Sequence, residues 1–168
     1  MMSTSKIAIV TGGSRGIGRN TVLCLAERGV GSIFTYNSNR AEAEKVVSLA
    51  AKAGARALQP DTGKMGAFDG FVGHVREALA ELEAERFDYL VNNAGISSNA
   101  SLESITEAEM DALYDVHFKG VLFLTQKLLP LMRDGGRIVN ISSGLARFAG
   151  RNRIGYGSMK AAVETPTR

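Results

Sequence analysis

The sequence predicts an α/β fold in which one doubly wound parallel sheet carries helices on both faces. Three features of the 168 residues lead to this prediction. Short apolar strands alternate with helical patterns five times, a glycine-rich turn directly follows the first strand, and no repeat or linker divides the chain. Such alternation favours parallel strands joined by crossover helices. The early glycine turn further indicates the strand order 3-2-1-4-5, within a single domain spanning residues 1–168.

Three strands and three helices are expected in the first half of the chain. The strands are expected at 7–10, 32–36 and 55–59. The helices are expected from the glycine turn to residue 28, over 40–53 and over 68–82, where apolar residues recur at helical spacing. Gly29 and Gly54 are suited to end the first two helices, because glycine readily adopts the left-handed conformation of a C-terminal cap.

The second half is expected to add two strands and two helices. The strands are expected at 89–92 and 137–141. Thr106 and Glu109 form a capping-box pattern, which predicts that a long helix begins at this point. An apolar stripe continues over 110–131, and Asp134-Gly135-Gly136 is expected to end this helix. A last helix is expected to begin near Tyr156.

The glycine-rich turn is a candidate phosphate site. It reads Thr11-Gly12-Gly13-Ser14-Arg15-Gly16-Ile17-Gly18. A helix N-terminus offers unpaired N–H groups, and the absence of side chains on glycine lets a pyrophosphate approach the backbone. All of these residues except Gly13 are therefore predicted to contact a nucleotide. A purely structural turn is the alternative, because a glycine pattern alone is weakly specific.

Composition narrows the class of protein. The formal charge of +3 comes from scattered basic residues without a run of five or six, so no nucleic-acid partner is expected. Cys24 is the only cysteine, and residues 1–6 lack the apolar core of a secretory signal. The apolar segment 121–131 is too short to span a bilayer. We expect a soluble cytoplasmic domain without a membrane partner, and no residue spacing indicates a metal site.

Tyr156 and Lys160 are a candidate pair for proton transfer. Residues four apart near a helix start share one face, with β-carbons roughly 5–6 Å apart. An ammonium group at that distance favours the phenolate over the phenol, so the tyrosine would exchange a proton with a substrate oxygen more readily. Such pairs also occur by chance. Here, however, the preceding strand leads into Ser142-Ser143, which supplies a further hydroxyl group.

Taken together, these motifs resemble the short-chain dehydrogenase/reductase family along essentially the whole chain. The resemblance rests on the glycine turn at 11–18, Asn92-Asn93-Ala94-Gly95, Ser143 and the pair Tyr156 and Lys160. It implies a Rossmann-type fold and hydride transfer between a nicotinamide cofactor and a carbonyl or secondary alcohol. It also implies a homodimer or homotetramer.

The resemblance implies a role for each matching residue. Tyr156 would be the general acid/base, and Lys160 would tune it and hold the nicotinamide ribose. Ser143 would hydrogen-bond the reacting oxygen, with Ser142 as the competing choice. The implied cofactor contacts also include a segment after the third strand and one after the fourth: Asp61 at the adenine, the neighbouring Thr62, and Asn93, Ala94 and Gly95.

His117 is a departure from the family pattern. It stands where the family usually carries an asparagine, whose main-chain carbonyl takes part in a proton relay. Because a backbone role survives a change of side chain, His117 is kept as a candidate relay residue. The alternative is a core histidine on an apolar helical stripe, with its ring hydrogen-bonded locally.

The predicted cofactor is NADP(H) in preference to NAD(H). Enzymes that use NAD place a carboxylate about 20 residues after the glycine motif, where it binds the ribose 2′-hydroxyl. Here the second strand ends in Tyr36-Asn37-Ser38-Asn39-Arg40, without a carboxylate. Asn37, Ser38 and the guanidinium groups of Arg15 and Arg40 could instead surround a 2′-phosphate.

The resemblance also implies further chain beyond Arg168, since family members add C-terminal strands and a substrate loop that this sequence lacks. Two hypotheses follow. One is an NADPH-dependent oxidoreductase whose chain is truncated at the C-terminus. The other is a truncated, non-catalytic module that binds a nucleotide or a partner chain. The substrate itself is not predicted.

Overall fold

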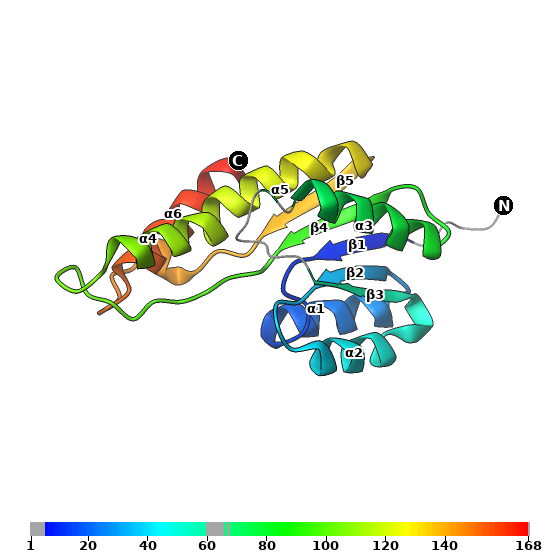
Figure 1. Cartoon of the computed structure of the whole chain (residues 1–168), viewed down its shortest axis with the longest axis horizontal. Helices are drawn as coiled ribbons and strands as arrows, with labels where there is room; N and C mark the ends of the chain where they lie inside the picture. Colours follow the sequence, from blue (N-terminus) through cyan, green and yellow to red (C-terminus); the bar gives the residue numbers. More distant parts are fainter. Residues whose placement is uncertain (1–5, 60–65, 67, 168) are drawn as a thin grey trace.

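The computed structural model describes residues 6–59, 66 and 68–167, and one parallel sheet lies between two layers of helices (Figure 1). In spatial order the strands are β3 (Ala55–Leu58), β2 (Gly31–Thr35), β1 (Ile7–Val10), β4 (Phe87–Asn92) and β5 (Met132–Asn140). Every neighbouring pair of strands is parallel. The predicted fold class and the order 3-2-1-4-5 are therefore confirmed.

Helices cover both faces of this sheet. On one face lie α1 (Gly16–Glu27) and α2 (Arg40–Leu49), and on the other α3 (Phe68–Glu81) and α5 (Gly120–Leu128) (Figure 1). A π-helical turn joins α4 to α5, and α6 packs against both α4 and this turn. The bounds are Glu107–Tyr114 for α4, Asp115–Lys119 for the π turn and Ile154–Glu164 for α6. Short 3₁₀ turns occupy Ala51–Ala53, Leu129–Leu131, Gly144–Ala146 and Thr165–Thr167.

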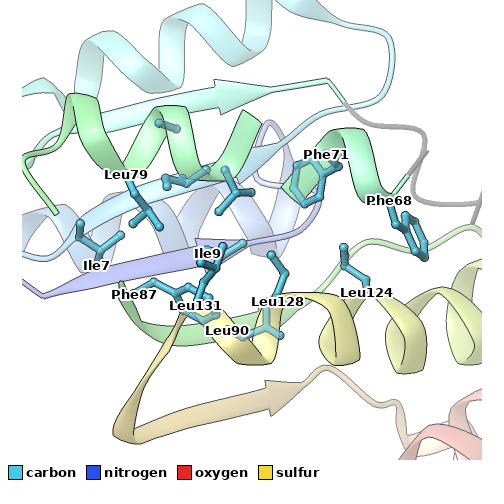
Figure 2. Packing of buried hydrophobic residues seen from close by; sticks show 13 residues of the cluster. Ile7, Ile9, Phe68, Phe71, Leu79, Phe87, Leu90, Leu124, Leu128 and Leu131 are labelled. Carbon is cyan, nitrogen blue, oxygen red and sulfur yellow. The ribbon is translucent and has the colours of Figure 1, made fainter. Parts of the chain in front are cut away.

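Two apolar cores form because successive side chains of a strand point to opposite faces of the sheet. Ile7 and Ile9 of β1 join the core beneath α3 and α5, whereas Ala8 and Val10 join the core beneath α1 and α2. Figure 2 shows the first of these cores, in which side chains of α3 and α5 meet over the strands. As the central strand, β1 is buried on both faces, which explains why its four residues are all apolar.

Two of the local signals at the helix ends are confirmed, Gly29 after α1 and the capping box of α4, whereas α2 ends at Leu49 and Gly54 instead follows the 3₁₀ turn Ala51–Ala53. Gly29 and Gly54 have φ of +71° and +80°, the left-handed region in which glycine carries no steric penalty. Thr106 accepts a hydrogen bond from the backbone of Glu109, whose side chain accepts one from the backbone of Thr106. The capping box therefore begins α4 as predicted.

The continuous helix predicted over 110–131 is wrong in two places. The π turn interrupts it at Asp115–Lys119. In addition, α5 ends at Leu128, because Pro130 lacks the N–H that the interior of an α-helix requires. As a result β5 begins at Met132 rather than at Arg137, and Asp134-Gly135-Gly136 lies in a bulge of that strand. Gly135 takes φ of +77° there.

None of the helices within the described residues combines the length and the apolar character needed to cross a lipid bilayer.

Candidate functional site

The glycine turn after β1 is held against the end of β2. The N–H of Gly12 donates to the Thr35 hydroxyl at 2.9 Å, and the N–H of Gly13 donates to the Thr35 carbonyl at 2.8 Å. Side chains would not fit in this turn. A Cβ on Gly13 would lie 2.6 Å from the Cβ of Phe34, and one on Gly18 would lie 2.2 Å from the carbonyl oxygen of Gly12. The glycines therefore let α1 begin directly against the turn.

The first turn of α1 carries no group that would compete with an anion. Arg15 precedes the helix in an extended conformation, its side chain makes no capping hydrogen bond, and the first turn contains no acidic residue. The unpaired N–H groups and the positive end of the helix dipole therefore suit a phosphate.

A cleft of about 380 Å³ opens in front of this helix end. Its lining joins the glycine turn to the loops that follow β2 and β4. Predicted site residues that line it are Gly12, Ser14, Arg15, Gly16, Ile17, Asn37, Ser38, Asn93, Ala94 and Gly95. Predicted residues from three separate segments therefore line one continuous cleft.

Thr11 joins the ends of β1 and β4 beneath the cleft. Its hydroxyl oxygen accepts hydrogen bonds from the backbone N–H groups of Asn93 and Ala94, both at 2.9 Å. In return, the side-chain amide of Asn93 donates to the carbonyls of Thr11 at 2.8 Å and Gly12 at 3.1 Å. Thr11 and the Asn93 side chain therefore brace the strands, and the backbone of 93–95 forms the cleft lining.

Tyr156 and Lys160 lie in the first two turns of α6. The ammonium nitrogen of Lys160 is 5.7 Å from the centre of the Tyr156 ring and donates to the Ile141 carbonyl at 2.6 Å. Lys160 is only 6% exposed, and this burial lowers the pKa of its ammonium group. The predicted pair is therefore brought together at the end of β5.

The two serines after β5 have different surroundings. The hydroxyl of Ser142 donates to the Glu164 carboxylate at 2.9 Å. The hydroxyl oxygen of Ser143 accepts a hydrogen bond from the N–H of Leu145 at 3.2 Å, which leaves its own proton available to donate. Of the two serines, Ser143 therefore has the hydroxyl better suited to bind a substrate oxygen.

His117 lies in the π turn and is buried, with 2% of its surface exposed. Its Nε2 is 2.7 Å from the carbonyl oxygen of Ile96 and 3.2 Å from the N–H nitrogen of the same residue. Its ring meets the Tyr156 ring edge-on, with centroids 5.3 Å apart. Burial lowers the pKa of His117, and the positive charge of Lys160 lowers it further, while the Ile96 carbonyl opposes the shift.

Besides Thr11, Tyr156 and Lys160, whose positions are given above, the predicted cofactor residues Gly18 and Arg40 do not line the cleft. Asp61 and Thr62 lie outside the described residues. Arg40 does not line the cleft, because its guanidinium group pairs with Glu44 one turn further along α2, at 2.7 Å. The prediction that Arg40 belongs to the cleft is therefore corrected.

The lining also contains five residues that were not predicted as site residues: Thr35, Tyr36, Asn39, Ile96 and Val116. Thr35 reads only as a strand residue in the sequence, and Val116 as part of an apolar helical stripe, so neither carried a signal. Ile96 follows directly after the recognised Asn93-Ala94-Gly95 and could have been included. Within the described residues, no group of three or more His, Cys, Asp or Glu side chains is arranged to hold a metal ion.

Comparisons with known proteins agree with this geometry. A sequence model of the family described as short chain dehydrogenase matches residues 6–168. The hydroxynaphthalene reductase-like protein Arp2 of Metarhizium robertsii is 36% identical over 168 residues, which cover 98% of this chain and 61% of that protein. The short-chain dehydrogenase/reductase FrzI of a Cladobotryum species is 38% identical, over 97% of this chain and 62% of that protein.

Solved structures similar to this chain include a ketoreductase and a short chain dehydrogenase. The landomycin C-6 ketoreductase LanV, with bound NADP and rabelomycin, superposes with a TM-score of 0.91 and 35% identity, covering 96% of this chain and 67% of that one. A short chain dehydrogenase from Burkholderia cenocepacia in complex with NADP gives 0.88 and 34%, covering 99% and 66%. The chain spans about three fifths of the length of the curated relatives it matches.

Replacing Gly18 with alanine should lower the free energy of unfolding by about 2–3 kcal/mol, because the added Cβ would overlap the Gly12 carbonyl. Gly73→Ala is the matched control. A Cβ at Gly73, in the interior of α3, would have no atom within 4 Å, so this change should stabilise by about 0.5–1 kcal/mol. Urea unfolding measures both, and equal effects at the two positions would contradict the close approach of α1 to the turn.

Thr11→Val should lower the free energy of unfolding by about 1–3 kcal/mol, since valine keeps the shape but leaves two partly buried N–H groups without an acceptor. Thr21→Val removes a hydroxyl that bonds only locally to the Ile17 carbonyl and should change stability by less than about 0.5 kcal/mol. Amide hydrogen exchange should also accelerate at Asn93 and Ala94. Unchanged exchange there would rule out the bracing role of Thr11.

Proposed function

Because the chain belongs to the short-chain dehydrogenase/reductase family of oxidoreductases, we propose that it uses NADPH to transfer hydride to or from a carbonyl or secondary-alcohol substrate. One observation carries the proposal. Gly95 and Ile96 line the cleft at the glycine turn, and His117 bonds to Ile96 while its ring touches Tyr156. A nucleotide site and a candidate proton donor are thus joined by direct contacts.

The residues of the cleft suit a dinucleotide. The uncapped start of α1 and the backbone of the glycine turn would bind the pyrophosphate, and the backbone of 93–95 would lie against the adenosine side. The LanV and Burkholderia cenocepacia structures carry NADP, which supports the same class of cofactor here.

The phosphate on the ribose decides between NADPH and NADH. The loop after β2 contributes Asn37 and Ser38 to the cleft and no carboxylate, while Arg15 contributes a guanidinium group. A carboxylate would repel a 2′-phosphate, whereas arginine binds phosphate through paired, charge-assisted hydrogen bonds. We therefore assign the preference for NADP(H) chiefly to Arg15, with Asn37 and Ser38 as additional donors.

When bound, the reduced nicotinamide supplies the hydride. In the direction of reduction, Tyr156 would donate its hydroxyl proton to the carbonyl oxygen as negative charge builds there. Ser143 would donate a hydrogen bond to the same oxygen. Lys160 would favour the resulting phenolate through its positive charge and hold the nicotinamide ribose, since an ammonium group has two further donors beside the one on Ile141.

The proposal includes a homodimer or homotetramer acting on a small molecule. Large apolar side chains are exposed along α4 and α5, among them Tyr114, Leu122 and Leu129 just beyond α5. A helical surface of this kind suits a helix of a second copy.

A nucleotide-binding module without turnover is the second candidate. The observation that favours it is that neither Tyr156 nor Lys160 is among the residues that line the cleft. The two candidates share the cleft and differ only in whether Tyr156 transfers a proton.

Arg15→Ala should weaken NADPH binding about ten- to hundredfold and leave NADH binding nearly unchanged, because only NADPH carries the 2′-phosphate. Arg40→Ala should have a much smaller effect, since Arg40 pairs with Glu44 outside the cleft. Fluorescence titration of both cofactors measures the dissociation constants. Tighter binding of NADH than of NADPH by the parent protein, or an equal loss for both cofactors in Arg15→Ala, would contradict the assignment.

Tyr156→Phe should reduce NADPH oxidation with a panel of ketones by at least about a hundredfold and retain NADPH binding. Tyr114→Phe makes the same chemical change at an exposed position of α4 and should leave the rate unchanged. Turnover by the phenylalanine variant at the parent rate would remove Tyr156 from the chemistry. A parent protein that binds NADPH and turns over none of the ketones would favour the binding module.

A further inference from the structure

We propose that His117 is a positioning residue that couples the cofactor cleft to Tyr156, and that it does so only as the neutral imidazole with its proton on Nε2. The catalytic meaning of this inference rests on the proposed function, but the coupling itself can be measured without turnover. It follows from contacts on opposite sides of one buried ring.

On one side, the ring holds the cleft lining. Its Nε2 lies within hydrogen-bond distance of both backbone polar groups of Ile96. It also packs so closely on Gly95 that a Cβ there would lie 2.7 Å from Cε1 of His117. Because Gly95 and Ile96 line the cleft, a displacement of the ring must displace that part of the lining.

On the other side, the ring holds the phenol. The planes of His117 and Tyr156 meet at 90°, the edge-to-face arrangement that aromatic pairs favour. Tyr156 lies in the first turn of α6. Because the buried His117 ring packs against the Tyr156 ring, it restricts the direction in which the phenol points.

The contacts also select one protonation state. The contact of Nε2 with the Ile96 carbonyl, at 2.7 Å, is shorter than its contact with the Ile96 N–H nitrogen, at 3.2 Å, and therefore favours a proton on Nε2 over a lone pair there. Nδ1 is buried and has no hydrogen-bond partner among the described residues. A second proton on Nδ1 would therefore meet no acceptor. From α6, the positive charge of the Lys160 ammonium group opposes a positive charge on the ring. Within the π turn, Asp115 and Lys119 pair with each other at 3.0 Å.

Protonation of His117 at low pH should weaken its contacts with Ile96 and Tyr156. Burial lowers the pKa of His117 in the folded protein below its ordinary value near 6.5. The contribution of the neutral ring to stability is complete above that ordinary value and is lost as the pH falls through the lowered pKa. Acid should therefore release Ile96 and Tyr156 together.

The test uses a His74→Gln background, in which His117 is the only histidine of the chain. Proton NMR follows Cε1–H of His117, the amide of Ile96 and the ring of Tyr156 during an acid titration without cofactor. All three signals should move with one midpoint below 6.5. If the chemical shifts of Ile96 and Tyr156 do not change as His117 titrates, the proposed coupling is wrong.

Two variants separate positioning from packing. His117→Phe keeps a ring against Tyr156 and loses the donor to Ile96, so NADPH binding should weaken about tenfold. His117→Gln restores a distal donor, and should recover NADPH affinity while abolishing the acid transition of Ile96. Parent-like affinity in folded His117→Phe would overturn the proposal. Should that variant fail to fold, the glutamine variant and the acid titration decide. Failure of the parent to bind NADPH would instead contradict the proposed function.

Discussion

The junction between the carboxyl ends of β1 and β4 is the constraint on which the site depends. The chain builds β1, β2 and β3 in one direction and then returns to place β4 and β5 on the other side of β1. The loops that leave β1 and β4 therefore diverge and open a crevice between them. A crevice at the centre of a sheet needs a brace, and the Thr11 hydroxyl provides it by accepting from two backbone N–H groups of the β4 loop.

A second set of hydrogen bonds joins β4 to β5 and α5, and the end of β5 to α6. The Asn92 side chain donates to Asn140 at the end of β5 and to Thr125 on α5. The next residue of the β5 end, Ile141, donates its N–H to the Asn92 carbonyl and accepts from Lys160. The lysine is thus fixed to the backbone of the sheet as well as to its own helix. Its position relative to the cleft is consequently set by strand pairing, which is more rigid than a surface loop.

Much of this arrangement could be predicted from the sequence because its determinants are local. A strand, a glycine turn and a helix follow one another in a few residues, and the capping box of α4 spans only four. The errors arose where the outcome depends on distant contacts. The stripe over 110–131 has helical spacing throughout, so its spacing alone does not distinguish the π turn at Asp115–Lys119 from an uninterrupted α-helix. Arg40 was assigned to the cleft from its distance along the chain, but Glu44 on the same helix face binds it first.

The surroundings of the Tyr156 ring favour one positive charge over two. Lys160 and His117 both lie next to its ring, both are buried, and burial lowers the pKa of both groups. Two adjacent cations in a poorly solvated site repel each other strongly, so the group with the weaker hold on its proton loses it. An imidazole, with an ordinary pKa near 6.5, gives up its proton long before an amine near 10.4. The neutral histidine therefore leaves Lys160 as the cation beside the phenol, and the Ile96 carbonyl accepts a hydrogen bond from the one N–H group that remains on the ring. The charge that favours a phenolate and the ring that orients the phenol are in this way supplied by different residues, which do not compete.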